Sequence, residues 1–286
     1  MFAQTNPTLP EDDMHPLYNV GGRPRRGGAP LLLAVALTLL SHIGIEAQAT
    51  QTRSTGGEEL DVSGVATFSI LGYDPATGEV GGAVQSRVFS VGNGVLWAEA
   101  GVGAVATQAI IDVSYGPQGL LLLESGLDPN EVAAALLRND PNPRPEDWPM
   151  GGRQFAVMDA SGAVAAHTGP QASEWAGHRI GRHVSAQGNI LAGPQVVDAM
   201  VEAFETTQGH LSFRLLAALE AGQAAGGDRR GMQSAAMLIV QEDGGVWLNN
   251  DVILRLQVDD HEQPIDELRR LVEIAAAQRE RLGGGR

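Results

Sequence analysis

The chain has 286 residues, a formal net charge of −15 and 37 glycines, and it contains neither lysine nor cysteine. The missing lysine excludes Schiff-base and pyridoxal chemistry, and the missing cysteine excludes thiol nucleophiles, disulfides and iron–sulfur ligation. A chain this acidic repels phosphate backbones, so we expect no nucleic-acid partner, and a glycine share well above the usual 7% or so favours turns and short strands over a helical bundle.

The N-terminal part has the features of a targeting segment. Three arginines at 23–26 precede an apolar run over 30–45, and an Ala-Gln-Ala sequence at 47–49 follows it. A basic region, an apolar run too short to span a bilayer and an Ala-x-Ala site are typical of a secretory signal peptide. We expect residues 1–49 to be removed and the product to be secreted or periplasmic without a stable membrane span; an uncleaved anchor is the alternative. Residues 50–66 are polar and small, which predicts a linker or a pro-segment.

Alternation of apolar residues begins at Thr67 and predicts a hairpin over about 67–88. Phe68 and Ile70 share one face of its first strand, and Thr67, Ser69 and Leu71 share the other, as in a half-buried strand. Glycines in the second strand indicate a close approach of backbones. Residues 97–108 are expected to form a further buried strand.

Helices and strands alternate along the rest of the chain. Asp128, Pro129 and Glu131 supply an N-cap, a first-turn proline and a capping-box glutamate for a helix that runs to Leu137. We then expect a loop at 140–149, two strands over 154–168, one strand over 178–187, helices that start at 194 and 212, strands at 234–241 and 246–258, and a helix from 264. Hairpins that alternate with helix pairs predict an α+β fold, in which two antiparallel sheets pack together with helix layers outside.

Thr67 is a candidate nucleophile because it begins the first strand directly after a removable segment. Cleavage before it would place an α-amine with a pKa of about 7.7–8 beside the hydroxyl, and a threonine activated by its own amine is a known nucleophile. An ordinary β-branched strand residue after a linker is the alternative.

Two glycine-rich connections carry the other candidate groups. Asn189 lies in a turn before a helix, where its amide either caps that helix or points at a developing oxyanion. Asp228, Arg229 and Arg230 lie in the connection that leads to the strand at Ser234. They form either a turn with a surface ion pair or a site for an anion or carboxylate.

The remaining motifs are weak. His167, His178 and His183 lie on separate predicted strands without metal-ligand spacing, and no G-x-S-x-G serine elbow is present. A loose G-x-G-x-x-A match at 101–106 lacks the helix that a dinucleotide site needs, so a glycine-rich strand is the preferred interpretation. We expect no metal site and no cofactor.

Several segments resemble, in the same order, a bacterial family catalogued as domain of unknown function 1028. They cover residues 67–258 and lie at 67–70, 82–87, 101–108, 114–117, 187–193 and 225–234. That family is grouped with the N-terminal nucleophile (Ntn) hydrolases, so the resemblance implies a four-layer αββα sandwich and Thr67 as the nucleophile, with its freed amine as the base. Some members carry a small peptidoglycan-binding domain after a segment similar to 258–270. We expect residues 259–286 to form a C-terminal helix, the remnant of such an extension.

The resemblance implies a hydrolase that acts on an amide or peptide bond of a small substrate, with cell-wall fragments among the candidates, and the N-terminal segment implies that it is exported. The catalytic candidates are Thr67, Asn189, Asp228 and Ser234, and the substrate-binding candidates are Arg87, Gln108, Arg229 and Arg230. The alternative is a non-catalytic cell-envelope module on the same fold, which binds peptidoglycan or peptides. Glycine-rich sandwiches with apolar outer helices often self-associate, so a homo-oligomer is an open option.

Overall fold

The computed structural model describes residues 67–283, so the expected signal peptide (1–49) and the expected linker or pro-segment (50–66) lie outside the described residues. The alternation that begins at Thr67 produces a strand, and this strand is an inner member of the larger of two sheets. Between residues 67 and 283, no helix is both long and apolar enough to cross a bilayer.

The strands within 67–283 form two antiparallel sheets. The six-stranded sheet has the order β10 (Val252–Val258), β9 (Ser234–Val240), β2 (Val80–Ser86), β1 (Thr67–Tyr73), β8 (Val184–Asn189) and β7 (Gly177–Gly181). The four-stranded sheet has the order β3 (Leu96–Glu99), β4 (Gly103–Ala109), β5 (Arg153–Asp159) and β6 (Val164–Thr168).

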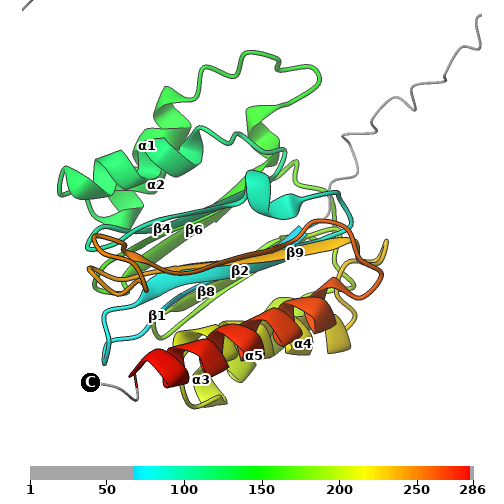
Figure 1. Cartoon of the computed structure of the whole chain (residues 1–286). Coiled ribbons are helices and arrows are strands. Elements are labelled where there is room, and N and C mark those ends of the chain that lie inside the picture. The colour runs from blue at the N-terminus through cyan, green and yellow to red at the C-terminus, as the bar shows by residue number, and fades with distance from the viewer. Residues whose placement is uncertain (1–66, 284–286) are drawn as a thin grey trace, which may run out of the picture. The chain divides into compact units, whose positions relative to one another are not determined.

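Five α-helices in the described residues cover the outer faces of the two sheets (Figure 1). α1 (Tyr115–Glu124) and α2 (Pro129–Asn139) contact the four-stranded sheet, whereas α3 (Gln195–Thr206), α4 (Leu211–Ala224) and α5 (Pro264–Gly283) contact the six-stranded sheet. The order from one side to the other is therefore helices, sheet, sheet, helices. This confirms the mixed fold with two antiparallel sheets.

The alternation along β1 divides its side chains between two cores. Phe68 and Ile70 pack with Phe204 and other residues of α3 and α4, while Leu71 packs between the sheets. The expectation that this strand is half-buried is wrong, because helices cover one of its faces and the second sheet covers the other.

Close packing also explains the glycines of β2. A Cβ atom added to Gly81 would lie 2.0 Å from the carbonyl oxygen of Leu238 on the neighbouring strand β9. No side chain fits there without a shift of the backbone.

The capping box before α2 is present as predicted. The Asp128 carboxylate accepts hydrogen bonds from the backbone of Asn130 and Glu131, and the Glu131 side chain accepts one from the backbone N–H of Asp128. The helix predicted to start at 212 is α4, which begins at Leu211. The N-cap is His210, whose Nδ1 accepts a hydrogen bond of 3.1 Å from the backbone N–H of Ser212.

Two regions predicted as single strands are hairpins. Residues 97–108 divide into β3 and β4, and residues 178–187 divide into β7 and β8. In the second turn His183 has a φ of 62°, a left-handed conformation that sequence patterns assign to glycine.

The last strand begins later than predicted. β10 starts at Val252, and residues 241–251 form a connection in which Trp247 and Leu248 are 76% and 92% exposed. These apolar residues have the composition of a strand but lie outside the sheet.

The C-terminal helix α5 is integrated into the fold. Ile265, Leu268 and Val272 on one of its faces are buried in the same core as Phe68, and the helix contacts β9, β10 and α4. The helix expected from residue 264 is therefore amphipathic, with its apolar face packed against the core.

Candidate functional site

One row of polar side chains crosses the six-stranded sheet where β1 begins. Thr67, the first residue of β1, is paired with Asn189 on β8 and with Ser86 on β2, and Ser86 is paired with Ser234 on β9. Residues directly opposite one another on antiparallel strands point to the same face of a sheet. The register thus brings Thr67, Asn189 and Ser234, all predicted from the sequence, into one row with Ser86.

This row faces the space between the two sheets. Ser69 shares the face of Thr67 and donates a hydrogen bond of 2.6 Å to Gln108 Oε1 on the opposite sheet. Thr67 is 1% exposed, its Oγ1 lies 3.0 Å from Ser86 Oγ, and its carbonyl oxygen accepts a bond of 3.1 Å from Gln108 Nε2. Both the hydroxyl and the main chain of Thr67 are therefore fixed in place.

Behind Thr67, buried amides join the two sheets. Gln108 Nε2 also donates to Gln154 Oε1 at 2.9 Å. Gln187 Nε2 donates to Ser69 Oγ at 2.7 Å, and Gln187 Oε1 accepts from Ser185 Oγ at 2.9 Å. Gln108, which was predicted to bind substrate, is buried, and its amide bonds to the Thr67 carbonyl and to Gln154.

Gln154 is the centre of this network, and it is fully buried. Its Nε2 donates to Gly188 O at 2.8 Å, to Gly177 O at 3.1 Å and to Thr168 Oγ1 at 3.0 Å. Its Oε1 accepts from Asn189 Nδ2 at 3.2 Å. One amide on β5 therefore orients groups that belong to both sheets.

Asn189 has one buried atom without a partner. Its Oδ1 makes no hydrogen bond to any described residue, although the side chain is fully buried beside Thr67 in the row. Buried polar atoms are nearly always paired, so an exception suggests a missing partner. Asn189 does not cap α3, because the N-cap of that helix is Pro194 and no side chain bonds to it.

The turn that carries Asp228 lies beside the end of β8. Asp228 forms an isolated bridge with Leu191, two residues beyond Asn189. Its carboxylate accepts bonds of 3.0 Å from Arg230 Nη2 and 2.8 Å from the Arg230 backbone N–H. Within residues 67–283, no hydrogen bond joins Asp228 to Thr67, so Asp228 shapes the turn.

The arginines predicted to bind substrate lie close to this turn. Arg229 is exposed and donates to the carbonyl oxygen of Glu174 at 2.7 Å. Arg87 follows Ser86 directly and is exposed, and a Cβ atom added to Gly231 would lie 3.9 Å from Arg87 Nε. The structure thus brings Arg87 beside the segment that holds Arg229 and Arg230.

Ser234 anchors the segment after β2. Its Oγ donates to the carbonyl oxygen of Val88 at 2.6 Å and accepts from the backbone N–H of Val91 at 3.0 Å. Both hydrogen-bonding functions of this hydroxyl are in use, so Ser234 has a positioning role here.

The three histidines considered in the sequence do not come together as one group of potential metal ligands. His178 Nδ1 lies 2.9 Å from Thr168 Oγ1, and burial lowers the pKa of His178. Burial and then the neighbouring His178 lower the pKa of His167. Both imidazoles are therefore neutral at neutral pH. The described part of the chain contains no group of three acidic or histidine side chains that could hold a metal ion.

Ser86, Gln154 and most of the amide network were not predicted from the sequence. A signal was present, because polar residues at 69, 154, 185 and 187 interrupt strands that are otherwise apolar. Buried amides need partners, so such residues on two sheets predict bonds between the sheets. Which residues pair cannot be read from a single strand.

Comparisons with known proteins found one matching family model and similar solved structures. A family model described as a family of unknown function, DUF1028, matches residues 67–268. A crystal structure of a DUF1028 protein from Silicibacter pomeroyi is 33% identical and has a TM-score of 0.65, and the match covers 73% of this chain and 89% of that one. No curated protein matches the chain.

Proposed function

Because the chain belongs to the DUF1028 family, for which no function is known, we propose its activity from the site itself: it is an N-terminal nucleophile hydrolase that cleaves an amide or peptide bond with Thr67. The order helices, sheet, sheet, helices agrees with the αββα sandwich of that superfamily. The nucleophile is generated when the residues before Thr67 are removed.

The observation that carries this proposal is the position of Thr67. It is the first residue of an inner strand, its hydroxyl contacts a second hydroxyl at 3.0 Å, and its carbonyl is held by Gln108. A threonine at a strand start, oriented before any substrate arrives, fits a preorganised nucleophile. A buried threonine elsewhere in a strand also needs a partner for its hydroxyl, so the distinguishing feature of Thr67 is its place at the start of an inner strand.

The reaction follows from the groups in the row. The neutral α-amine of Thr67 takes the proton of Oγ1, and Oγ1 attacks the carbonyl carbon of the substrate to form a tetrahedral intermediate. The resulting ammonium gives its proton to the leaving amine as the C–N bond breaks. Water then attacks the threonine ester with the same amine as base, which releases the acid and restores the hydroxyl.

Asn189 serves this reaction with both ends of its amide. Nδ2 carries two hydrogens, of which Gln154 accepts one, and the second remains for the oxyanion. The unpaired Oδ1 accepts a hydrogen from the α-amine that Thr67 acquires on cleavage. The buried unpaired atom thus gains its partner only in the processed protein.

Positive charge near Thr67 determines which substrates are favoured. Arg87, Arg229 and Arg230 gather at the end of an acidic protein where Thr67 lies. They favour a substrate with a carboxylate near the scissile amide, and arginine supplies the positive field because the chain contains no lysine. We propose that the enzyme acts after export, in the periplasm or outside the cell.

The test compares two preparations, one that begins at Thr67 and one that retains Ala66. A β-lactone probe acylates a nucleophilic threonine oxygen by ring opening, so no leaving group is lost. A single increase in mass on the peptide that contains Thr67 therefore identifies Thr67 as the nucleophile. We expect labelling, and hydrolysis of aminoacyl anilides, in the first preparation alone. Thr67→Val should lower both at least about a thousandfold, whereas Thr107→Val, which changes another buried strand threonine, should retain them.

The same experiment can refute the proposal. Equal labelling of the two preparations, or full activity in Thr67→Val, would exclude an N-terminal nucleophile. N-terminal sequencing of the exported protein is an independent test. A mature chain that starts at Thr50 keeps Thr67 internal and would contradict the proposal. Binding to peptidoglycan that survives Thr67→Val, without any hydrolysis, would support the non-catalytic alternative.

A further inference from the structure

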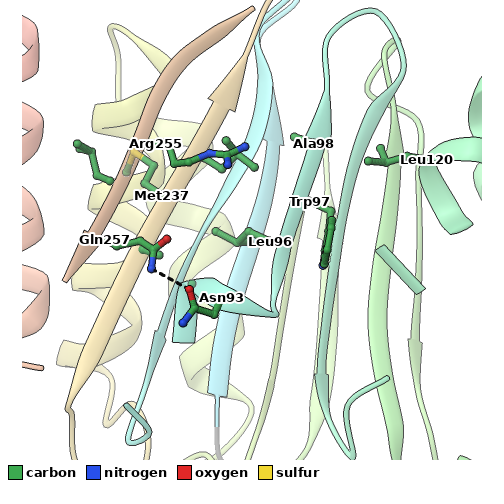
Figure 2. Close-up of a pocket in the computed structure, with 12 residues that line it drawn as sticks. Asn93, Leu96, Trp97, Ala98, Leu120, Met237, Arg255 and Gln257 are labelled. Carbon is green, nitrogen blue, oxygen red and sulfur yellow. Dashed lines mark hydrogen bonds between the residues drawn. The ribbon is translucent and has the colours of Figure 1, made fainter. Parts of the chain in front are cut away.

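A second site opens on the side of the molecule, along the free edge of the four-stranded sheet. A cavity of about 240 Å³ lies between the edge strand β3 and the strands β9 and β10 of the other sheet. Figure 2 shows Arg255 reaching from β10 toward the strand that carries Leu96 and Ala98. Thr67 does not line this cavity.

The backbone of β3 presents to the cavity hydrogen-bonding groups that pair with no other backbone group in residues 67–283. The backbone N–H of Thr107 on β4 donates to the carbonyl oxygen of Val95, so Val95 and every second residue after it bond to β4. The N–H and C=O groups of Leu96 and Ala98 therefore point away from β4, toward the open edge. An unpaired edge of this kind is a template for a further strand.

Arg255 gives the cavity its charge. It is the one charged residue among those that line the cavity, and it forms no ion pair with an acid in residues 67–283. At the other end Gln257 Nε2 donates to Asn93 Oδ1 at 3.4 Å and to Asp259 Oδ1 at 3.1 Å. The planar guanidinium of Arg255, which pairs with no acid in residues 67–283, can accept the carboxylate of a ligand in a bidentate geometry.

Apolar side chains complete the lining on both sides of β3. Leu96 and Leu238 lie on the side of the sheet interior, and Trp97 and Leu120 lie on the side of α1. A strand laid along β3 would direct successive side chains alternately to these two sides, as a pleated strand does. The volume is below the 300 Å³ or so at which typical cofactor and drug-sized sites begin, which favours a short segment.

We propose that this edge cleft binds a short extended peptide that carries a carboxylate. The peptide adds a strand to β3 through the backbone groups of Leu96 and Ala98, and Arg255 pairs with its carboxylate. This site requires no nucleophile at Thr67 and stands whether or not the proposed hydrolase activity is found.

The experiment measures peptide binding to the folded protein by calorimetry and by NMR. The probe is the blocked tetrapeptide acetyl-Val-Leu-Val-Glu-amide, with three comparison ligands: its glutamine counterpart, a version N-methylated on alternate backbone nitrogens, and hexanoate. We expect the glutamate peptide to shift the amide signals of Leu96 and Ala98 and to bind about tenfold more tightly than the glutamine peptide. The N-methylated peptide and hexanoate should bind at least about tenfold more weakly, because neither can pair with β3.

Two arginine variants give the matched control. Arg255→Gln should weaken the glutamate peptide about tenfold and abolish its advantage over the glutamine peptide, whereas Arg281→Gln on α5 should change neither affinity. Arg255 is exposed, so an unchanged NMR spectrum of the free variant will show that its fold is intact. Four results would each overturn the proposal: no binding of the glutamate peptide, signal shifts confined to another surface, equal binding of hexanoate, or an unaltered preference in Arg255→Gln.

Discussion

Replacement of Gln154 by leucine tests the structure of the candidate site most directly. Gln154 is fully buried and makes five hydrogen bonds to side chains and backbone carbonyls of both sheets. A buried hydrogen bond contributes about 0.5–1.5 kcal/mol net, so the loss of all five has an upper bound of about 7.5 kcal/mol. Gln108 Nε2 keeps other acceptors and Thr168 keeps His178, and leucine adds apolar burial, so we expect a loss of about 3–4 kcal/mol.

Urea denaturation followed by circular dichroism measures this loss. Gln118→Leu is the matched control, because Gln118 is exposed and makes a single side-chain bond to Ser114, and it should change the free energy of unfolding by less than about 0.5 kcal/mol. A loss below about 1 kcal/mol for Gln154→Leu would contradict the network described above.

Three further predictions concern parts of the fold outside the network. Asp140→Ala leaves the buried Arg153 guanidinium without the carboxylate that lies 2.9 Å away, and should lower the free energy of unfolding by about 3–5 kcal/mol at pH 7. Burial opposes ionisation of Asp140, but hydrogen bonds from Arg153 and Tyr115 lower the pKa of this carboxyl overall. The stability that ionised Asp140 contributes is therefore present above the unfolded pKa of about 3.9 and is lost as the pH falls through the folded pKa. Wild type and Asp140→Asn should consequently converge in denaturation experiments at low pH. Burial and the bond to Asp140 raise the pKa of Tyr115 far above its ordinary value, so an alkaline absorbance titration should show this phenol ionising only when the protein unfolds. Gly81→Ala should destabilise the sheet by more than about 2 kcal/mol in denaturant unfolding, since its Cβ meets a backbone carbonyl at 2.0 Å; a loss under about 0.5 kcal/mol would show that β2 and β9 can separate without cost.

Elements that depend on a few neighbouring residues were predicted correctly from the sequence. The Asp128 capping box, the hairpin that begins at Thr67 and the amphipathic face of α5 each depend on a few neighbouring residues, and each is present. The turn at His183 was missed because a non-glycine residue adopts the left-handed conformation there. Trp247 and Leu248 look like strand residues because composition alone does not show that they are exposed.

The candidate site depends on pairing that no local pattern contains. Thr67 and Asn189 are opposite one another in the sheet but 122 positions apart in the chain, and Ser86 enters the row only through the register of β1 and β2. A slip of one residue in either pairing would turn these side chains to the opposite face of the sheet. The sequence therefore indicates candidate residue types, and the register decides which of them meet.

The surroundings of the Thr67 hydroxyl constrain any mechanism that uses it. Among described residues, the hydroxyl bonds to Ser86, and no histidine, aspartate or glutamate side chain bonds to it. Serine cannot accept a proton at neutral pH, and the chain has no lysine to do so. A base must then come from the main chain, and the one basic group that the main chain can provide is a terminal α-amine. If Thr67 is a nucleophile, its activity is consequently controlled by where the mature chain begins, and a protein that folds correctly with Ala66 in place is expected to be inert.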